Sequence, residues 1–354
     1  MNLPLTRGIA LTSAVAVVLS GCGNDGTDKN GASPLSPTGS LYVDSHRPAY
    51  TDTFGTTYEG DYYPVAAGYR WDYAGPVSVT TTYSVTGTLE GQQVNEQDRE
   101  TDSGIGRGFR VIRPRRRIRL PSGEYTVYPE QFMSSFWDPY SYDETVRYLE
   151  KLGDAVYVRA FEGTDGQLVE VRDPVFIKSP LVVGDRWVSS PKVEYNAPFP
   201  SMEDSDGIRS ISFDMNSVIH VVGTQNVTVM GRSVEAVRLE QVMETGGLIA
   251  TQYGDMSINM TMIAVFYLKK NLGIVTQKLE DMSMNMQIML SEGAVRLTMD
   301  MTVTGATELS LTGYPASFQP LTKPGLPRPP DPRMALQIRR AQQTMLAMTH
   351  AIMP

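Results

Sequence analysis

Alternation of apolar and polar residues with a period of two is the feature that most restricts how this chain can fold. It is clearest at 256–262, 282–288 and 297–303, where methionine, isoleucine, leucine or valine occupies every second position and mostly polar residues lie between. Successive side chains of a strand point to opposite faces, so these runs predict half-buried antiparallel strands. Their apolar positions would share one face.

β-Branched and aromatic runs bounded by turn residues predict further strands at 77–85, 155–161, 168–172, 217–222, 234–239 and 263–268. Asp165-Gly166 predicts a hairpin turn. One internal helix is predicted from Ser141 to Leu152, because Ser141 and Glu144 form a capping box and Gly153 can end the helix. The expected fold class is mostly β, with antiparallel sheets in a half-barrel or sandwich-like arrangement.

An internal repeat divides the β region. Pro64 to Trp71 and Pro180 to Trp187 carry proline, glycine, arginine and tryptophan at identical spacing. We therefore expect two related β halves, 58–178 and 179–316. The repeated segment resembles the "YFPLxxGxxW" segment of many bacterial lipoproteins and secreted β-proteins that have no agreed activity, and the resemblance implies fold and location only. Burial of the two tryptophans in the sheet is the expected role, with sugar binding as the alternative.

The N-terminus has the layout of a secretory signal peptide, with Arg7 before a short apolar run and small residues before Cys22. That run is shorter than the roughly 20 residues that span a bilayer. Leu19-Ser20-Gly21-Cys22 resembles the lipobox of bacterial lipoproteins. The resemblance implies cleavage after residue 21, acylation of Cys22 with chains such as palmitate and, because Gly23 follows, the outer membrane. The sequence does not decide between the periplasmic face and the surface face of that membrane. Residues 22–57 are expected to be a flexible tether.

The C-terminal part changes in character. Residues 317–332 are rich in proline and predict a stiff linker. Residues 333–354 predict an amphipathic helix, whose apolar stripe is Met334, Ile338, Ala341, Met345, Met348 and Ile352. Three roles for the stripe remain open: docking on the β region, binding an envelope protein partner, or contact with a membrane surface.

The net charge of the chain and the motifs that it lacks argue against several classes of function. The formal net charge of −8 argues against nucleic acid as the main partner. His46, His220 and His350 lie far apart, and no nucleophile elbow, phosphate loop or zinc-spaced cluster appears. We expect neither a cofactor nor a metal. Scattered carboxylates such as Glu203, Asp204 and Asp206 keep a glycan hydrolase as a third candidate.

Two groups of residues are candidate binding sites. The first is the apolar face of the methionine-rich strands, made of Met256, Met260, Met262, Met282, Met284, Met286, Met299 and Met301. It can be a packed core, a pliable groove for a lipid or other apolar ligand, or a set of thioether ligands for Cu(I). The second is the basic run that includes Arg113, Arg115, Arg117 and Arg119.

The basic run has two interpretations. The planar guanidinium groups of these arginines could bind the phosphates of lipid headgroups. Alternatively, the run could pair with Glu96, Asp98, Glu100 and Asp102 across a turn at 104–108, as an ion-paired hairpin.

Taken together, these features predict a non-catalytic envelope lipoprotein that binds or scaffolds. The leading form holds a lipid or apolar ligand on the methionine face, and the alternative is a structural subunit that engages a partner through its C-terminal helix.

Overall fold

The computed structural model describes residues 46–89, 91–134, 143–162, 168–171, 174–189, 192–195, 208–251, 254–290 and 295–313. The predicted signal peptide, Cys22, the first part of the tether, the Pro-rich linker and the C-terminal helix lie outside these ranges. Glu203, Asp204, Asp206 and His350 also lie outside them. In the described part of the chain, no helix is long and apolar enough to cross a membrane.

Antiparallel strands dominate the described chain, as the alternating pattern predicts. The first group is β1 (Thr57–Tyr58), β2 (Arg70–Leu89), β3 (Gln92–Ile112), β4 (Arg116–Leu120), β5 (Gly123–Ser134), β6 (Asp143–Leu152), β7 (Ala155–Glu162), β8 (Leu168–Glu170) and β9 (Val175–Ile177). The second group is β10 (Leu181–Val182), β11 (Arg186–Ser189), β12 (Lys192–Tyr195), β13 (Ile208–Val229), β14 (Arg232–Thr251), β15 (Gly254–Lys269), β16 (Gly273–Leu290) and β17 (Val295–Leu311).

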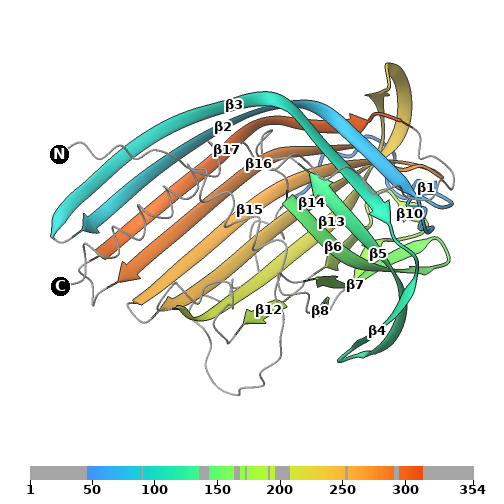
Figure 1. The fold of residues 1–354 in the computed structure, drawn as a ribbon. Helices are drawn as coiled ribbons and strands as arrows, with labels where there is room; N and C mark the ends of the chain where they lie inside the picture. The colour runs from blue at the N-terminus through green and yellow to red at the C-terminus, as the bar shows by residue number, and fades with distance from the viewer. Residues whose placement is uncertain are drawn as a thin grey trace.

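Fifteen of these strands form one sheet, with the order β11-β13-β14-β15-β16-β17-β2-β3-β5-β6-β7-β8. Strands β12, β4 and β9 pair with β13, β5 and β7, and β1 pairs with β10 in a separate two-stranded sheet. Figure 1 shows the long strands β2, β3 and β13 to β17 side by side as a broad curved sheet, with the shorter strands gathered near one end. The pairing of β17 with β2 makes strands from both predicted halves parts of the same sheet.

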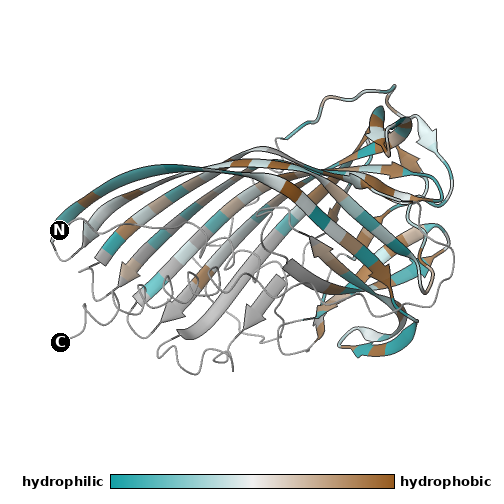
Figure 2. Cartoon of the chain, turned by 45° about the horizontal axis from the view of Figure 1, so that its top comes forward, coloured by the Kyte–Doolittle hydropathy of each residue, from teal (hydrophilic) through white to brown (hydrophobic). Residues whose placement is uncertain are grey.

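Several apolar clusters of the described residues stabilise the sheet. The largest lies where the shorter strands and the ends of the long strands meet, and it contains Trp71, Ile112, Leu149, Trp187 and Leu239. A second cluster contains five methionines of β15, β16 and β17: Met260, Met262, Met282, Met284 and Met301. A third joins Ile118 and Leu120 of β4 to Tyr148 of β6. Figure 2 shows apolar and polar residues alternating along the long strands.

The two repeated tryptophans are core residues. Trp71 is 1% exposed and Trp187 is 6% exposed. Each follows a glycine with positive φ, Gly68 at 85° and Gly184 at 90°, which turns the chain into a strand. The packing interpretation is confirmed, and sugar binding by these two rings is wrong because both rings are buried.

The helix predicted from Ser141 to Leu152 is wrong over 143–152, which form β6. This strand pairs with β5 on one side and β7 on the other, so its backbone groups are satisfied by two ladders. Gly153, at a φ of 60°, lies in the tight turn to β7 rather than at a helix end. Long-range pairing therefore overrides the local capping signal.

The ion-paired hairpin predicted around 104–108 is also wrong. These glycine-rich residues lie inside the second half of β3 and form no turn. The acidic positions of β3 pair with β2, where Glu96 opposes Val85 and Glu100 opposes Thr81. The arginines of β4 pair instead with β5. Glycine weakens a strand interior, but here β2 pairs with every residue from 104 to 108, which keeps this segment in the strand.

Part of the predicted tether is fixed to the sheet. The amide of Thr51 donates to the carbonyl of Val222 at 3.1 Å. The side chain of Asp52 accepts hydrogen bonds from the amide and the hydroxyl of Thr224, at 2.6 and 2.9 Å. Gly223 allows this close approach, because a Cβ there would lie 2.4 Å from Oγ1 of Thr51. The predicted tether is therefore too long, since its residues 46–57 belong to the folded body.

Candidate functional site

The methionine face exists as predicted, on adjacent strands of one sheet. Cross-strand register places Met260 opposite Met284, Met284 opposite Met301 and Met262 opposite Met282. These five side chains are 2 to 6% exposed and pack with Val77, Val79, Leu279 and Val303, with Met243 and Met299 at the margin. Met256 and Met286 continue the same alternation in register with Ile288 and Met299. For five of the eight predicted methionines, the sequence thus identified both the shared face and its burial.

The four arginines of the predicted basic run do not all lie on one strand. Arg113 and Arg115 lie in the link between β3 and β4, so strand alternation does not apply to them. Arg113 donates to the side chain of Gln131. Arg117 and Arg119 are exposed on β4, and Arg119 pairs with Glu124 at 2.5 Å. An ion pair this exposed contributes between about 0 and 1 kcal/mol.

The structure brings together two histidines that the sequence did not predict to be neighbours. The ring centroids of His46 and His220 lie 6.3 Å apart, and His46 Nε2 is in hydrogen-bond contact with the buried side-chain carboxyl group of Glu240. Burial lowers the pKa of His220, although the charge of Glu240 opposes this effect. The two histidines are 174 positions apart in sequence, so no local signal could have joined them. Within the described ranges, no group of three or more His, Cys, Asp or Glu residues is placed to hold a metal ion.

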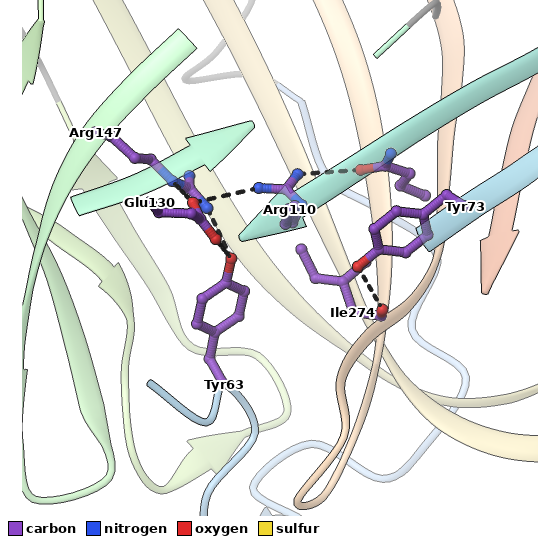
Figure 3. Close-up of polar contacts among 7 residues, drawn as sticks. Tyr63, Tyr73, Arg110, Glu130, Arg147 and Ile274 are labelled. Atoms are coloured by element: carbon purple, nitrogen blue, oxygen red, sulfur yellow. Dashed lines mark hydrogen bonds and ion pairs between the residues drawn. The ribbon is translucent and has the colours of Figure 1, made fainter. Parts of the chain in front are cut away.

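A cluster of buried charged residues joins β3, β5, β6 and β16 (Figure 3). Glu130 of β5 is fully buried and accepts hydrogen bonds from Arg147 of β6 and from the hydroxyl of Tyr63. Arg110 of β3 lies 3.6 Å from the same carboxylate. Arg110 also donates to the side chain of Gln277 in β16 at 3.1 Å, which links the cluster to the methionine-rich strands.

Electrostatics keep this cluster charged. Burial by itself would raise the pKa of Glu130, but the charges of Arg147 and Arg110 and the hydrogen bonds from Arg147 and Tyr63 outweigh it and lower that pKa. Burial, followed by the charge of Glu130, raises the pKa of Tyr63 to about 12, so its hydroxyl stays a donor at neutral pH. The Glu130 carboxylate has all of its partners within the protein, which favours a structural junction. Among the described residues, Nε of Arg110 and Nε2 of Gln277 are buried there without a hydrogen-bond partner.

Aromatic rings cover the two arginines of the junction. The guanidinium carbon of Arg110 lies 4.1 Å from the ring centroid of Phe132, and that of Arg147 lies 4.1 Å from the ring centroid of Phe176. Cation–π contacts of this kind reduce the cost of removing a guanidinium from water. No sequence motif marks these residues, which come from positions 63, 110, 130 and 147.

Comparisons with known proteins add little to this geometry. No protein-family model and no curated protein matches the sequence. Among solved structures, the chain is similar to a protein of Parabacteroides distasonis ATCC 8503 classed as a lipoprotein, with 10% identity, a TM-score of 0.25, and coverage of 71% of this chain and 100% of that one. It is also similar to a protein of Bacteroides fragilis NCTC 9343 classed as exported, with a YmcC-like fold, at 10% identity and a TM-score of 0.22, covering 70% of this chain and 99% of the other.

A third similarity is to a loop-deletion mutant of OmpT, an outer membrane protein of Vibrio cholerae, at 9% identity and a TM-score of 0.19, covering 67% of this chain and 99% of that one. With TM-scores of 0.25 or less, none of these similarities supports a statement about what this chain does. What the described residues establish is a mostly antiparallel β protein with a buried methionine face.

Proposed function

We propose that this chain is a lipid-anchored protein of the cell envelope, placed at the outer membrane, that binds an apolar molecule and does not catalyse a reaction. The observation that supports binding is the methionine face. Its cluster draws on β2, β15, β16 and β17, four neighbouring strands of one sheet, and it holds five buried methionines.

The choice of methionine favours an adaptable face over a fixed core. Methionine is unbranched, and its thioether is polarizable, so it can repack around occupants of different shape. Elsewhere in the sheet the core uses rigid branched residues instead, such as Val221, Leu239 and Val265. The difference between the two clusters supports a ligand-accommodating role for the methionine face.

The proposed anchor is supported by the residues before the folded body. Cys22 lies 24 positions before His46, where the described chain begins. From Thr51 to Thr56 the chain is held against Val222 and Val183 by backbone hydrogen bonds. A lipid on Cys22 would therefore hold the sheet near the membrane on a link of about 24 residues, and an apolar ligand drawn from that membrane would be within reach.

The anchor is tested by replacing its cysteine. Cys22→Ser removes the thiol that carries the diacylglyceryl group, so the chain should stay unprocessed and take up no labelled palmitate. Metabolic labelling followed by membrane fractionation measures both effects. Labelling of the variant equal to that of the unaltered chain would overturn the lipoprotein assignment and leave the binding proposal standing.

The binding face is tested by a change of shape at constant volume. Met260, Met284 and Met299 are replaced together by leucine, which should alter the set of lipids that co-purify with the protein, because branched side chains repack less freely. Stability should fall by less than about 1.5 kcal/mol per substitution. Mass spectrometry of extracted lipids and binding of an apolar fluorophore give the readout.

Met133→Leu is the matched control, because Met133 is buried in β5 outside the methionine cluster. It should leave lipid selection unchanged. If the unaltered protein binds neither the fluorophore nor any lipid, the methionine face is only a core and the binding proposal fails.

A further inference from the structure

Two adjoining cavities lie where the N-terminal segment crosses the ends of β14 and β15. The first has a volume of about 350 Å³ and is lined by polar groups that include Asp52, Tyr58, Tyr62, Glu235, Lys269 and Lys270. The second has a volume of about 270 Å³ and is lined mainly by apolar side chains, among them Val229, Val234, Leu272, Val275 and Leu311. Glu235 and Lys269 line both cavities, so the two are neighbours.

The polar cavity presents both signs of charge. Asp52 stays ionised, because the hydrogen bond from Tyr58 and those from Thr224 lower the pKa of its carboxyl group despite partial burial. Glu235 lies close enough to Tyr62 for its charge to raise the pKa of that phenol, after the larger effect of burial. Lys269 Nζ donates to the backbone carbonyl of Glu235 at 3.0 Å, which holds an ammonium beside this acid.

The floor of the polar cavity is apolar, formed by Ala236, Val237 and Leu268. The second cavity continues this apolar character, and the exposed Met230 lies at its edge. Binding sites typically combine apolar walls with a few placed polar groups. Here most of the charged groups line the first cavity and apolar side chains dominate the second, an arrangement that matches a molecule with a charged head and an apolar tail.

We propose that the two cavities together form a binding site for a single-chain amphiphile with a zwitterionic head group, such as a lysophospholipid that carries ethanolamine. Its ammonium would lie beside Asp52 and Glu235, its phosphate beside Lys269 and Lys270, and its acyl chain in the apolar cavity. This site is separate from the methionine face, since neither cavity is lined by any of that cluster's residues.

Binding is measured by isothermal titration of the chain from residue 22 to 354 with Cys22→Ser, using lysophosphatidylethanolamine below its critical micelle concentration. We expect saturable binding with one ligand per chain. Glu235→Gln and Lys270→Gln should each weaken the affinity about tenfold, as the loss of one charged contact does. Lysophosphatidylglycerol, which lacks the ammonium, should bind at least about tenfold more weakly.

The apolar cavity, which would hold the acyl chain, is tested by a substitution at its edge. Ser233 is exposed and lines the apolar cavity, so Ser233→Phe should fill the cavity and abolish binding. Ser283→Phe makes the same change at an exposed position of β16 outside both cavities, and should bind like the unaltered chain. Lys270→Gln, at an exposed turn position, gives an independent readout if Ser233→Phe does not fold.

Three outcomes would overturn the site: no saturable binding by the unaltered chain, equal affinity for both lysophospholipids, or full binding by a folded Ser233→Phe protein. The leucine triple variant separates this site from the methionine face, and it should bind lysophosphatidylethanolamine normally. If that variant loses binding while Ser233→Phe retains it, the amphiphile occupies the methionine face, and the cavity assignment fails while the proposed function survives.

Discussion

Glu130→Gln is expected to lower the free energy of unfolding by about 3 to 5 kcal/mol, as breaking a buried ion pair does. The substitution keeps the shape of the side chain and removes its charge. Arg147 and Arg110 would then be left buried, at 13% and 5% side-chain exposure, without their shared counter-ion. Neither guanidinium can lose its proton to escape this cost. Chemical denaturation at pH 7 measures the effect.

Glu124→Gln is the matched control. Glu124 makes the same type of ion pair with Arg119, but the two side chains are 57% and 83% exposed. Removing that charge should change the free energy of unfolding by no more than about 1 kcal/mol. A loss for Glu130→Gln as small as for Glu124→Gln would contradict the assignment of the buried cluster as a structural junction.

The penalty for Glu130→Gln should depend on pH. The pKa of Glu130 is lowered in the folded protein from its ordinary value of 4.5. A carboxyl group with a lowered pKa contributes stability that is fully present above the unfolded pKa and is lost as the pH falls through the folded pKa. The difference in stability between the two proteins should therefore be constant near neutral pH and shrink below about pH 4.5.

Trp71→Ala is expected to lower the free energy of unfolding by about 3 to 5 kcal/mol, the second large effect. The ring is 1% exposed and lies 5.7 Å from the ring of Tyr63 and 4.7 Å from that of Tyr69, between centroids. Its indole nitrogen donates to the carbonyl of Leu272. Truncation would remove all of these contacts and leave a cavity, which thermal and urea denaturation should both detect.

Trp187→Ala should fall at the lower end of the same range. Its ring is 6% exposed, and its indole nitrogen has no hydrogen-bond partner among the described residues. Phe54→Ala is the control for removal of an aromatic side chain, because Phe54 is 72% exposed. That change should cost no more than about 0.5 kcal/mol. An unchanged melting temperature for Trp71→Ala would contradict the core assignment.

The sequence by itself determined the methionine-rich strands and the face that they share. Period-two alternation needs only the local geometry of an extended chain, so the run at 282–288 predicted both β16 and the methionine face that β16 contributes to. The repeated Pro-Gly-Arg-Trp segment also predicted two buried tryptophans, because a turn followed by a large apolar ring is a local signal.

The candidate sites were less predictable. The methionine face was found because its members recur within single strands. The cluster of Tyr63, Arg110, Glu130 and Arg147 was missed because each member comes from a different segment and none is unusual in its own neighbourhood. The same holds for the cavities, whose lining joins residues 52–62 to residues 224–237 and 268–270.

Only the tertiary structure decided which strands pair. Residues 143–152 carry a helix capping signal, yet they form β6, because β5 and β7 offer hydrogen bonds along both edges. The glycines at 104–108 continue β3 because β2 pairs along their whole length. Both outcomes depend on partners distant in sequence, and the energy of such pairing exceeds the local preference of about 1 kcal/mol that a single sequence displays.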